Sequence, residues 1–252
     1  MKRRLHTMMI AAISIIAVMV TGCGSSQSPE KVITVENIKD AKVGDVIKFG
    51  SYEQDNNMSN GNEPIEWIVL EELSGKRLLL SKYALDGKSY NGEPTEVYWE
   101  NCTLRSWLND DFYNTAFSDS EKQRIITSSS PNPDTYEIWS IPCMNIKTGA
   151  SGGNKTPDKV FLLSWKQAKS YFDLKVDPNE SRIGKPDQKL FCEPTAYART
   201  QVLTQNNNCC GWWLRSPGFS QSEASLVNEN GELATGKVEA RSNGVRPAII
   251  IE

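Results

Sequence analysis

The hydrophobic period of this chain changes twice, and these changes narrow its possible folds more than any other feature. Between residues 43 and 81, three short apolar runs follow the pattern of strands. From Leu104 to Phe117 the apolar residues follow helical spacing, and strand-like runs return from Trp212 onward. Because strands and short helices fall in separate blocks, we expect one α+β domain with mainly antiparallel sheets.

Local signals mark several boundaries between these blocks. The patterns Ser-x-x-Glu at 118–121 and Ser-x-x-Gln at 164–167 are capping boxes, and each predicts the start of a short helix. We expect a buried strand over 159–164 and a further helix over 196–202. The segment 128–158 is rich in Pro and Gly, and loops of that length are usually functional or mobile.

The first residues are typical of a secretory signal. Three basic residues at positions 2–4 precede the apolar run Met8–Val20, which is shorter than the roughly 20 residues of a membrane span. The following Val20-Thr21-Gly22-Cys23 resembles the bacterial lipobox, whose cysteine carries lipid such as palmitate and becomes the first mature residue. An uncleaved membrane anchor is the alternative. We therefore expect a signal peptide at 1–22, a lipidated tether at 23–42 and a folded domain at 43–252, on the extracytoplasmic face of the bacterial cell membrane.

Cleavage before Cys23 would change the chemistry that the protein can perform. It moves the net charge from −3 to −6 and removes His6, the only histidine. An acidic domain lacks the basic surface of a nucleic-acid binder, so we expect no nucleic-acid partner. Without histidine there is no Ser-His-Asp triad, no Cys-His dyad and no histidine metal ligand, so we expect neither a metal nor such catalysis.

The remaining cysteines are odd in number and form no Cys-x-x-Cys motif. We interpret them as small buried hydrophobic residues, because a disulfide between adjacent cysteines is strained and rare. The sequence leaves open whether any of them form disulfides. They are Cys102, Cys143, Cys192, Cys209 and Cys210.

Four ordered motifs carry a family resemblance. They are Trp99–Asn109, Asp158–Ser164, the Trp-Trp-Leu-Arg-Ser-Pro-Gly run at 212–218 and the Gly-Val-Arg-Pro-Ala run at 244–248. Over about Val43 to Ile251 the chain resembles a bacterial domain of unknown function, family 6273. The later motifs also resemble, more loosely, the C-type-lectin-like fold that formylglycine-generating enzymes share. These resemblances imply a single lectin-like domain, with short helices on antiparallel sheets and long loops, and no known reaction.

Three arginines within apolar segments allow two interpretations. Guanidinium groups suit a pocket for an anionic or sugar ligand, but they also suit internal clamps that pair with carboxylates or carbonyls. Adjacent tryptophans on a strand point to opposite faces, so we expect one of the pair at 212–213 to face outward, where it could stack on a sugar. The candidate ligand-binding residues are therefore Arg105, Trp213, Arg215, Ser216 and Arg246.

These observations favour a non-catalytic, membrane-anchored lipoprotein that binds an extracellular glycan, peptide or cell-wall component. Its expected partners are the membrane, through Cys23, and this unidentified ligand. One alternative is an extracytoplasmic enzyme, either like the formylglycine-generating enzymes or using carboxylates such as Glu66 and Glu100. Another is a structural component of a surface complex. We expect no cofactor, although oxygen atoms in the segment 228–232 offer Ca²⁺ as an alternative to a simple hairpin turn.

Overall fold

The computed structural model describes residues 32–33, 35–129, 131–132, 150–172, 188–205 and 208–252. The chain divides into two units, residues 1–30 and 31–252, and only the second contains described residues. Cys23, with the predicted signal, and Cys143 lie outside the described residues. Within the described ranges, no helix is long and apolar enough to cross a membrane.

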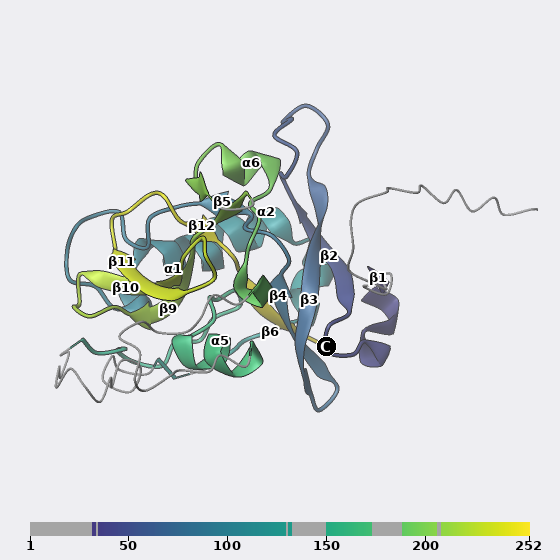
Figure 1. Cartoon of the computed structure of the whole chain (residues 1–252). Helices are drawn as coiled ribbons and strands as arrows, with labels where there is room; N and C mark the ends of the chain where they lie inside the picture. The colour runs from purple at the N-terminus through teal and green to yellow at the C-terminus, as the bar shows by residue number, and fades with distance from the viewer. Residues whose placement is uncertain (1–31, 34, 130, 133–149, 173–187, 206–207) are drawn as a thin grey trace, which may run out of the picture. The chain divides into compact units, whose positions relative to one another are not determined.

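The larger sheet of the second unit has six strands. The alternating runs between residues 43 and 81 become three antiparallel neighbours in this sheet, as predicted. Ser74 and Gly75, at φ 43° and 88°, make the tight turn between the second and third of these strands. The last strand of the chain inserts between two earlier ones (Figure 1). In spatial order the strands are β1 Val32–Ile33, β2 Val46–Tyr52, β3 Glu63–Leu73, β4 Lys76–Ser81, β13 Ala248–Ile251 and β6 Ile125–Ile126.

The residues before Val43 also pack on this sheet. Strand β1 pairs in parallel with β2, and a 3-10 helix, η1, follows at Val35–Asp40. Ile38 and Ala41 are only 3% and 0% exposed, because their apolar side chains join the hydrophobic core. The buried Arg77 donates to the carbonyl of Ala41 at 2.7 Å. The folded part therefore begins earlier than the boundary at Val43 that we expected.

A second sheet has five strands, and its central strand is buried on both faces. All six residues of β9 are buried, and both Trp212 and Trp213 are 0% exposed. Our prediction that one of these tryptophans faces outward is therefore wrong. Alternation still holds, but packed residues cover each side of the strand. In spatial order the strands are β11 Leu233–Lys237, β10 Glu223–Val227, β9 Trp212–Pro217, β12 Gly244–Val245 and β5 Asp86–Gly87.

The two sheets are joined near the end of the chain. We expected one strand over 245–251, but β12 belongs to the second sheet and β13 to the first. Arg246 and Pro247 make the crossing, and the carbonyl of Pro247 accepts from the Ser81 amide at 2.9 Å. A further two-stranded sheet pairs β7, Thr204–Gln205, with β8, Cys209–Cys210.

Short helices pack against these sheets. The helical spacing from Leu104 is confirmed as one continuous stretch, whose middle, η3, is a π-helix. Both predicted capping boxes are present, at Ser118 with Glu121 and at Ser164 with Gln167. The helix expected over 196–202 is only one turn long. The helices are η2 Trp99–Asn101, α1 Thr103–Trp107, η3 Leu108–Phe112, α2 Tyr113–Ala116, α3 Asp119–Arg124, α5 Trp165–Tyr171, η4 Gln188–Leu190 and α6 Ala196–Arg199.

The expected strand over 159–164 is buried but does not form a strand. Only Phe161 makes a β-bridge, to Ala248. Side chains satisfy much of the remaining backbone: Asn109 accepts from the Val160 amide and donates to its carbonyl, at 3.2 and 2.8 Å. The apolar run thus predicted burial correctly and secondary structure wrongly, because buried backbone needs partners of any kind.

Short helices on mainly antiparallel sheets confirm the α+β class. The described residues form one hydrophobic core that includes residues of both large sheets, among them Trp67 and Trp213. The lectin-like topology stays a prediction.

Candidate functional site

Arg105, on α1, clamps a distant segment to its own helix. Its Nε donates to Oδ1 of Asp158 at 2.6 Å, and its side chain is 20% exposed. Its Nη1 donates to the carbonyl of Glu100 at 3.0 Å, and its Nη2 donates to that of Pro157 at 3.3 Å. These bonds use all three nitrogens of the guanidinium group, which favours the clamp over the ligand-binding interpretation of Arg105.

Arg215, on β9, is 3% exposed and bridges several segments. Its Nε donates to Oδ1 of Asn132 at 2.8 Å, and its Nη1 donates to the carbonyl of Leu162 and to Oε1 of Gln167, each at 2.6 Å. Burial lowers the pKa of Arg215 to about 10, so the group still carries its charge at neutral pH. Neutral acceptors surround a buried cation here, which again favours the clamp.

Arg246 lies where the chain crosses from one sheet to the other. It is 2% exposed, and its Nε donates to the carbonyl of Ser81 at 3.0 Å. Its guanidinium carbon lies 4.9 Å from the ring centroid of Trp212, a cation–π contact. Its Nη1 has no hydrogen-bond partner among the described residues. Arg246 therefore fastens β13 to β4 from inside the core.

The other two candidate ligand-binding residues are also buried. Trp213 donates from Nε1 to the carbonyl of Lys88 at 2.8 Å, and its ring packs edge-on against Tyr90. Ser216, 0% exposed, accepts from the Trp165 amide at 3.0 Å, at the start of α5. No surface of Trp213 or Ser216 is open to a ligand in this structure. The structure brings these residues into one core but not to a shared cleft.

Asp158 is the ion-pair partner of Arg105, and the sequence alone did not identify it as such. It is 3% exposed, and its Oδ2 accepts from Trp99 Nε1 at 2.9 Å and from Thr156 Oγ1 at 2.7 Å, in addition to the ion pair with Arg105. Its backbone also makes two bonds with Ser128. In the sequence this aspartate stood at the start of an apolar run, where an acidic residue needs a buried partner. That signal was available and pointed to a cation elsewhere in the chain.

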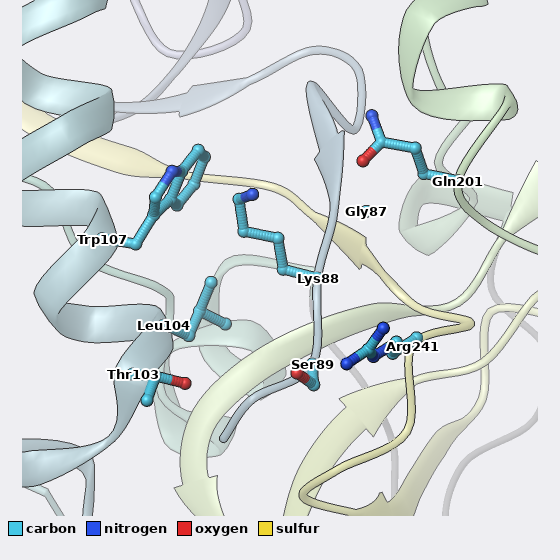
Figure 2. A pocket seen from close by; sticks show the side chains of 8 residues that line it. All are labelled: Gly87, Lys88, Ser89, Thr103, Leu104, Trp107, Gln201 and Arg241. Atoms are coloured by element: carbon cyan, nitrogen blue, oxygen red, sulfur yellow. The ribbon is translucent and has the colours of Figure 1, made fainter. Parts of the chain in front are cut away.

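The structure contains an open cavity that the sequence did not reveal. It has a volume of about 410 Å³ and lies between α1 and the segment that begins with β5 (Figure 2). Two further segments complete its wall, the turn after α6 and the loop between β11 and β12. The lining residues are Gly87, Lys88, Ser89, Thr103, Leu104, Trp107, Gln201 and Arg241.

The cavity is cationic, with one side chain held and one free. Lys88 Nζ lies 4.4 Å from the ring centroid of Trp107 and 3.7 Å from Oδ2 of the buried Asp86. Arg241 is exposed and makes no ion pair within the part of the chain that the structure describes. Figure 2 shows Lys88 directed toward Trp107 and Arg241 on the other side of the cavity, beside Ser89. A negatively charged group entering here would meet Arg241 without competing with an internal partner.

Asp86 supports the cavity from within the core. Its Oδ2 accepts from the Tyr52 hydroxyl at 2.7 Å, and its Oδ1 accepts from the Gly87 amide at 2.7 Å. Burial and the Asp86 carboxylate raise the pKa of Tyr52 well above its usual value, so Tyr52 stays protonated and donates. Gly87 is required by close packing, because a Cβ there would lie 2.8 Å from Cβ of Gln201.

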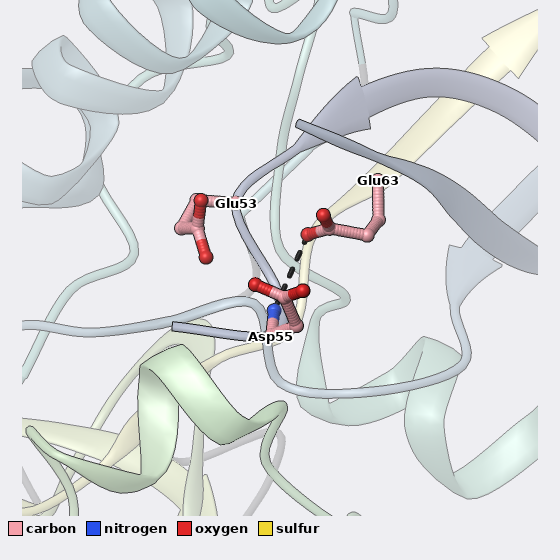
Figure 3. A group of neighbouring side chains, drawn as sticks. All are labelled: Glu53, Asp55 and Glu63. Atoms are coloured by element: carbon pink, nitrogen blue, oxygen red, sulfur yellow. Dashed lines mark hydrogen bonds between the residues drawn. The ribbon is translucent and has the colours of Figure 1, made fainter. Parts of the chain in front are cut away.

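Three carboxylates gather at the end of β2 (Figure 3). One oxygen from each of Glu53, Asp55 and Glu63 lies within 4.8 Å of the others. Oxygen ligands suit hard cations, but these oxygens already accept backbone amides. Glu63 accepts from Gln54 at 2.7 Å and Asp55 at 3.2 Å, and Glu53 accepts from Asn57 at 2.9 Å. These hydrogen bonds explain why the three carboxylates lie together: they hold the loop between β2 and β3.

The segment 228–232, whose oxygen atoms suggested a Ca²⁺ site, forms a hairpin turn between β10 and β11. Oδ1 of Asn228 accepts from the amides of Asn230 and Glu232 at 3.0 and 2.9 Å. Gly231, at φ 73°, supplies the left-handed residue that such a turn needs. The geometry of this turn is explained by its own hydrogen bonds.

The carboxylates named for an enzymatic alternative occupy different surroundings. Glu66 forms two ion pairs: its Oε1 lies 3.8 Å from Lys48 Nζ, and its Oε2 lies 3.2 Å from Lys82 Nζ. Glu100 accepts from the Asn154 side-chain amide at 2.9 Å. Neither lines the cavity between α1 and β5. Nothing in these contacts pairs the two as acid and base.

A comparison with protein families matches residues 74–252 to the family described as Domain of unknown function (DUF6273). The match begins at the turn between β3 and β4 and therefore starts later than the Val43 that the resemblance suggested. It includes every residue that lines the cavity. Curated proteins and solved structures give no match.

Proposed function

We propose, from the premise that this chain belongs to the DUF6273 family of domains of unknown function, that it is a lipoprotein with a ligand-binding domain. In this proposal Cys23 anchors the chain to the extracytoplasmic face of the bacterial cell membrane. The domain binds an extracellular glycan, peptide or cell-wall component and catalyses no reaction. The anchor is supported by the lipobox-like sequence, and the binding by the cavity between α1 and β5.

The cavity is the observation that carries the binding proposal. At about 410 Å³ it accommodates a small ligand or one unit of a polymer. Its wall combines an apolar part, Leu104 and Trp107, with hydroxyl groups and the free cation of Arg241. This combination suits a ligand that carries a carboxylate or phosphate beside hydroxyl groups. We therefore place the binding site here and not at the buried residues that the sequence indicated.

A binding role suits this wall better than a catalytic one. The eight lining residues include no histidine, cysteine or carboxylate, so none of these groups lines the cavity as a general base for the hydroxyls of Ser89 and Thr103. The one amine, Lys88, is held between Trp107 and Asp86. Lys88 therefore serves to shape the cavity and add positive charge.

The binding proposal is tested with arrays of acidic glycans and peptidoglycan fragments, probed with the full chain in mild detergent. We expect selective binding of anionic members, and a loss of about tenfold in affinity for Arg241→Gln, since one charge-assisted hydrogen bond contributes about 1.5 kcal/mol. The matched control is Lys237→Gln, which removes an exposed cation from β11 outside the cavity. Absence of any binding, or equal loss in both variants, would contradict the proposal.

The anchor is tested independently of the ligand. We expect labelled palmitate to be incorporated into the wild-type chain and not into Cys23→Ala, with the variant lost from the membrane fraction. Labelling that persists in Cys23→Ala would refute lipidation at this residue.

A further inference from the structure

Two of the buried cysteines lie next to each other in space although 18 positions separate them. The Cys210 amide donates to the carbonyl of Cys192 at 2.9 Å. The backbones of the two cysteines are therefore in direct contact. A disulfide joins residues whose α-carbons lie about 4.4 to 6.8 Å apart, so it requires such closely neighbouring backbones.

The side chains of this pair also meet. The Cys192 and Cys210 thiols lie close enough for each to shift the pKa of the other, and Cys192 Sγ lies 3.7 Å from the carbonyl oxygen of Glu193. Both residues are 1% exposed, and both are reduced in this structure. A Cβ added at Gly244 would lie 3.0 Å from Cys210 Sγ, so β12 leaves just enough room for this sulfur. The two thiols therefore belong to one closely packed, buried site.

The surroundings make the two thiols chemically unequal. Burial raises the pKa of Cys192, but the hydrogen bond from Cys210 and the positive charge of Arg246 lower it below its usual value. The bond to Cys192, together with burial, raises the pKa of Cys210. Cys192 is thus the thiol that more readily becomes the nucleophilic thiolate, and Cys210 is the one that keeps its proton.

We propose that Cys192 and Cys210 are a disulfide-forming pair, which a disulfide donor converts to an internal cross-link. In this reaction the Cys192 thiolate attacks one sulfur of the donor and releases the other as a thiol. Cys210 then gives up its proton and attacks Cys192 Sγ, releasing the second donor thiol. Two electrons pass to the donor, and the two protons leave with its thiols. Because both cysteines are buried, the exchange takes place during folding or in a locally opened state.

The cross-link would close a loop that forms part of the cavity wall. Residues 192–210 include α6 and Gln201, which lines the cavity between α1 and β5. Cross-linking the ends of this loop would restrict how far Gln201 moves from Gly87. The disulfide itself does not depend on the proposed ligand binding and is tested without any ligand.

The experiment refolds the full chain in mild detergent with oxidised glutathione, and in parallel with a reducing agent. Peptide mapping without reduction then identifies the linked cysteines. We expect one peptide joining Cys192 to Cys210, and its loss in Cys192→Ser and Cys210→Ser. Cys209→Ser distinguishes the adjacent cysteine, because the link should persist in that variant. Cys102→Ser is the control for removal of a buried thiol elsewhere.

The stability of the wild-type chain gives a second measurement, which needs no variant to fold. Closing a loop of this size should raise the Tm of the oxidised protein by roughly 6 to 12 °C over the reduced protein. A map in which Cys192 and Cys210 remain alkylatable in the refolded, oxidised protein would overturn the proposal. A link from Cys209 or Cys143 to either residue in place of the expected one would overturn it equally.

Discussion

Replacing Asp158 with asparagine tests whether the buried clamp holds the fold together. The substitution keeps the shape of the side chain but removes its charge and one of its two acceptor oxygens. Three donors meet this carboxylate, Arg105 Nε at 2.6 Å, Trp99 Nε1 at 2.9 Å and Thr156 Oγ1 at 2.7 Å. An asparagine that keeps the bonds to Trp99 and Thr156 turns its amide group toward the guanidinium of Arg105, so a donor faces a cation.

The expected cost follows from these contacts. Breaking a buried ion pair costs about 3 to 5 kcal/mol, and Arg105 keeps some access to water, so we expect the lower end, about 3 kcal/mol. For a folded unit of this size that corresponds to a fall in Tm of roughly 6 to 12 °C. Salt should change the difference little, because Asp158 has a side chain only 4% exposed.

Thermal unfolding followed by circular dichroism measures this effect, with Asp111→Asn as the control for an exposed aspartate. We expect the control to change stability by less than about 0.5 kcal/mol. A double-mutant cycle with Arg105→Met should show that the two losses do not add. The clamp does not contribute as argued if Asp158→Asn has the same Tm as the control Asp111→Asn. The same conclusion holds if the losses in stability caused by Asp158→Asn and Arg105→Met are additive.

Two further predictions follow from pKa shifts. Burial raises the pKa of Glu121, but bonds from Ser118 and from the Gly50 amide lower it below 4.5 overall, so Glu121→Gln should cost about 1 kcal/mol at pH 7. A carboxyl group with a lowered pKa in the folded state contributes its full stabilisation above the pKa of the unfolded chain and loses it as the pH falls. The difference in stability between wild type and Glu121→Gln should therefore shrink below about pH 4.5, and a constant difference in pH-dependent unfolding would contradict the prediction. Burial raises the pKa of Cys102 to about 12, so iodoacetamide at pH 8 should alkylate it far more slowly in the folded than in the unfolded chain. Equal rates, measured by mass spectrometry, would show that the thiol is exposed.

The local parts of the fold were predictable because their causes lie within a few residues. The capping boxes at Ser118 and Ser164 form between side chains three positions apart, so the sequence contains both partners. The hairpin at Ser74 and Gly75 depends on turn geometry between two alternating runs. The α+β class followed from such local signals added together.

The roles of the candidate site residues were not predictable in the same way. The ion-pair partner of Arg105 lies 53 positions later in the sequence, and the carbonyl that accepts from Arg246 lies 165 positions earlier. The sequence shows that an arginine is present, but it does not show whether the guanidinium group binds a ligand or a carbonyl of the same chain. Burial of Trp213 likewise depends on what covers the second face of β9, which alternation along one strand cannot reveal.

The cavity arises from the same long-range geometry. Its wall takes Thr103 and Trp107 from one helix, and Lys88, Gln201 and Arg241 from three separate loops. Thr103 and Trp107 lie within the motif Trp99–Asn109, but Lys88, Gln201 and Arg241 belong to none of the four motifs, so no motif indicated the cavity. By itself the sequence determined the α+β class and the capped helix starts at Ser118 and Ser164, because propensity and capping act over short stretches of chain. The lipid anchor at Cys23 stays a prediction from the same kind of local signal. Only the tertiary structure decided which polar side chains became buried clamps and which were left to face an open cavity, because each such side chain takes its partner from a distant part of the chain.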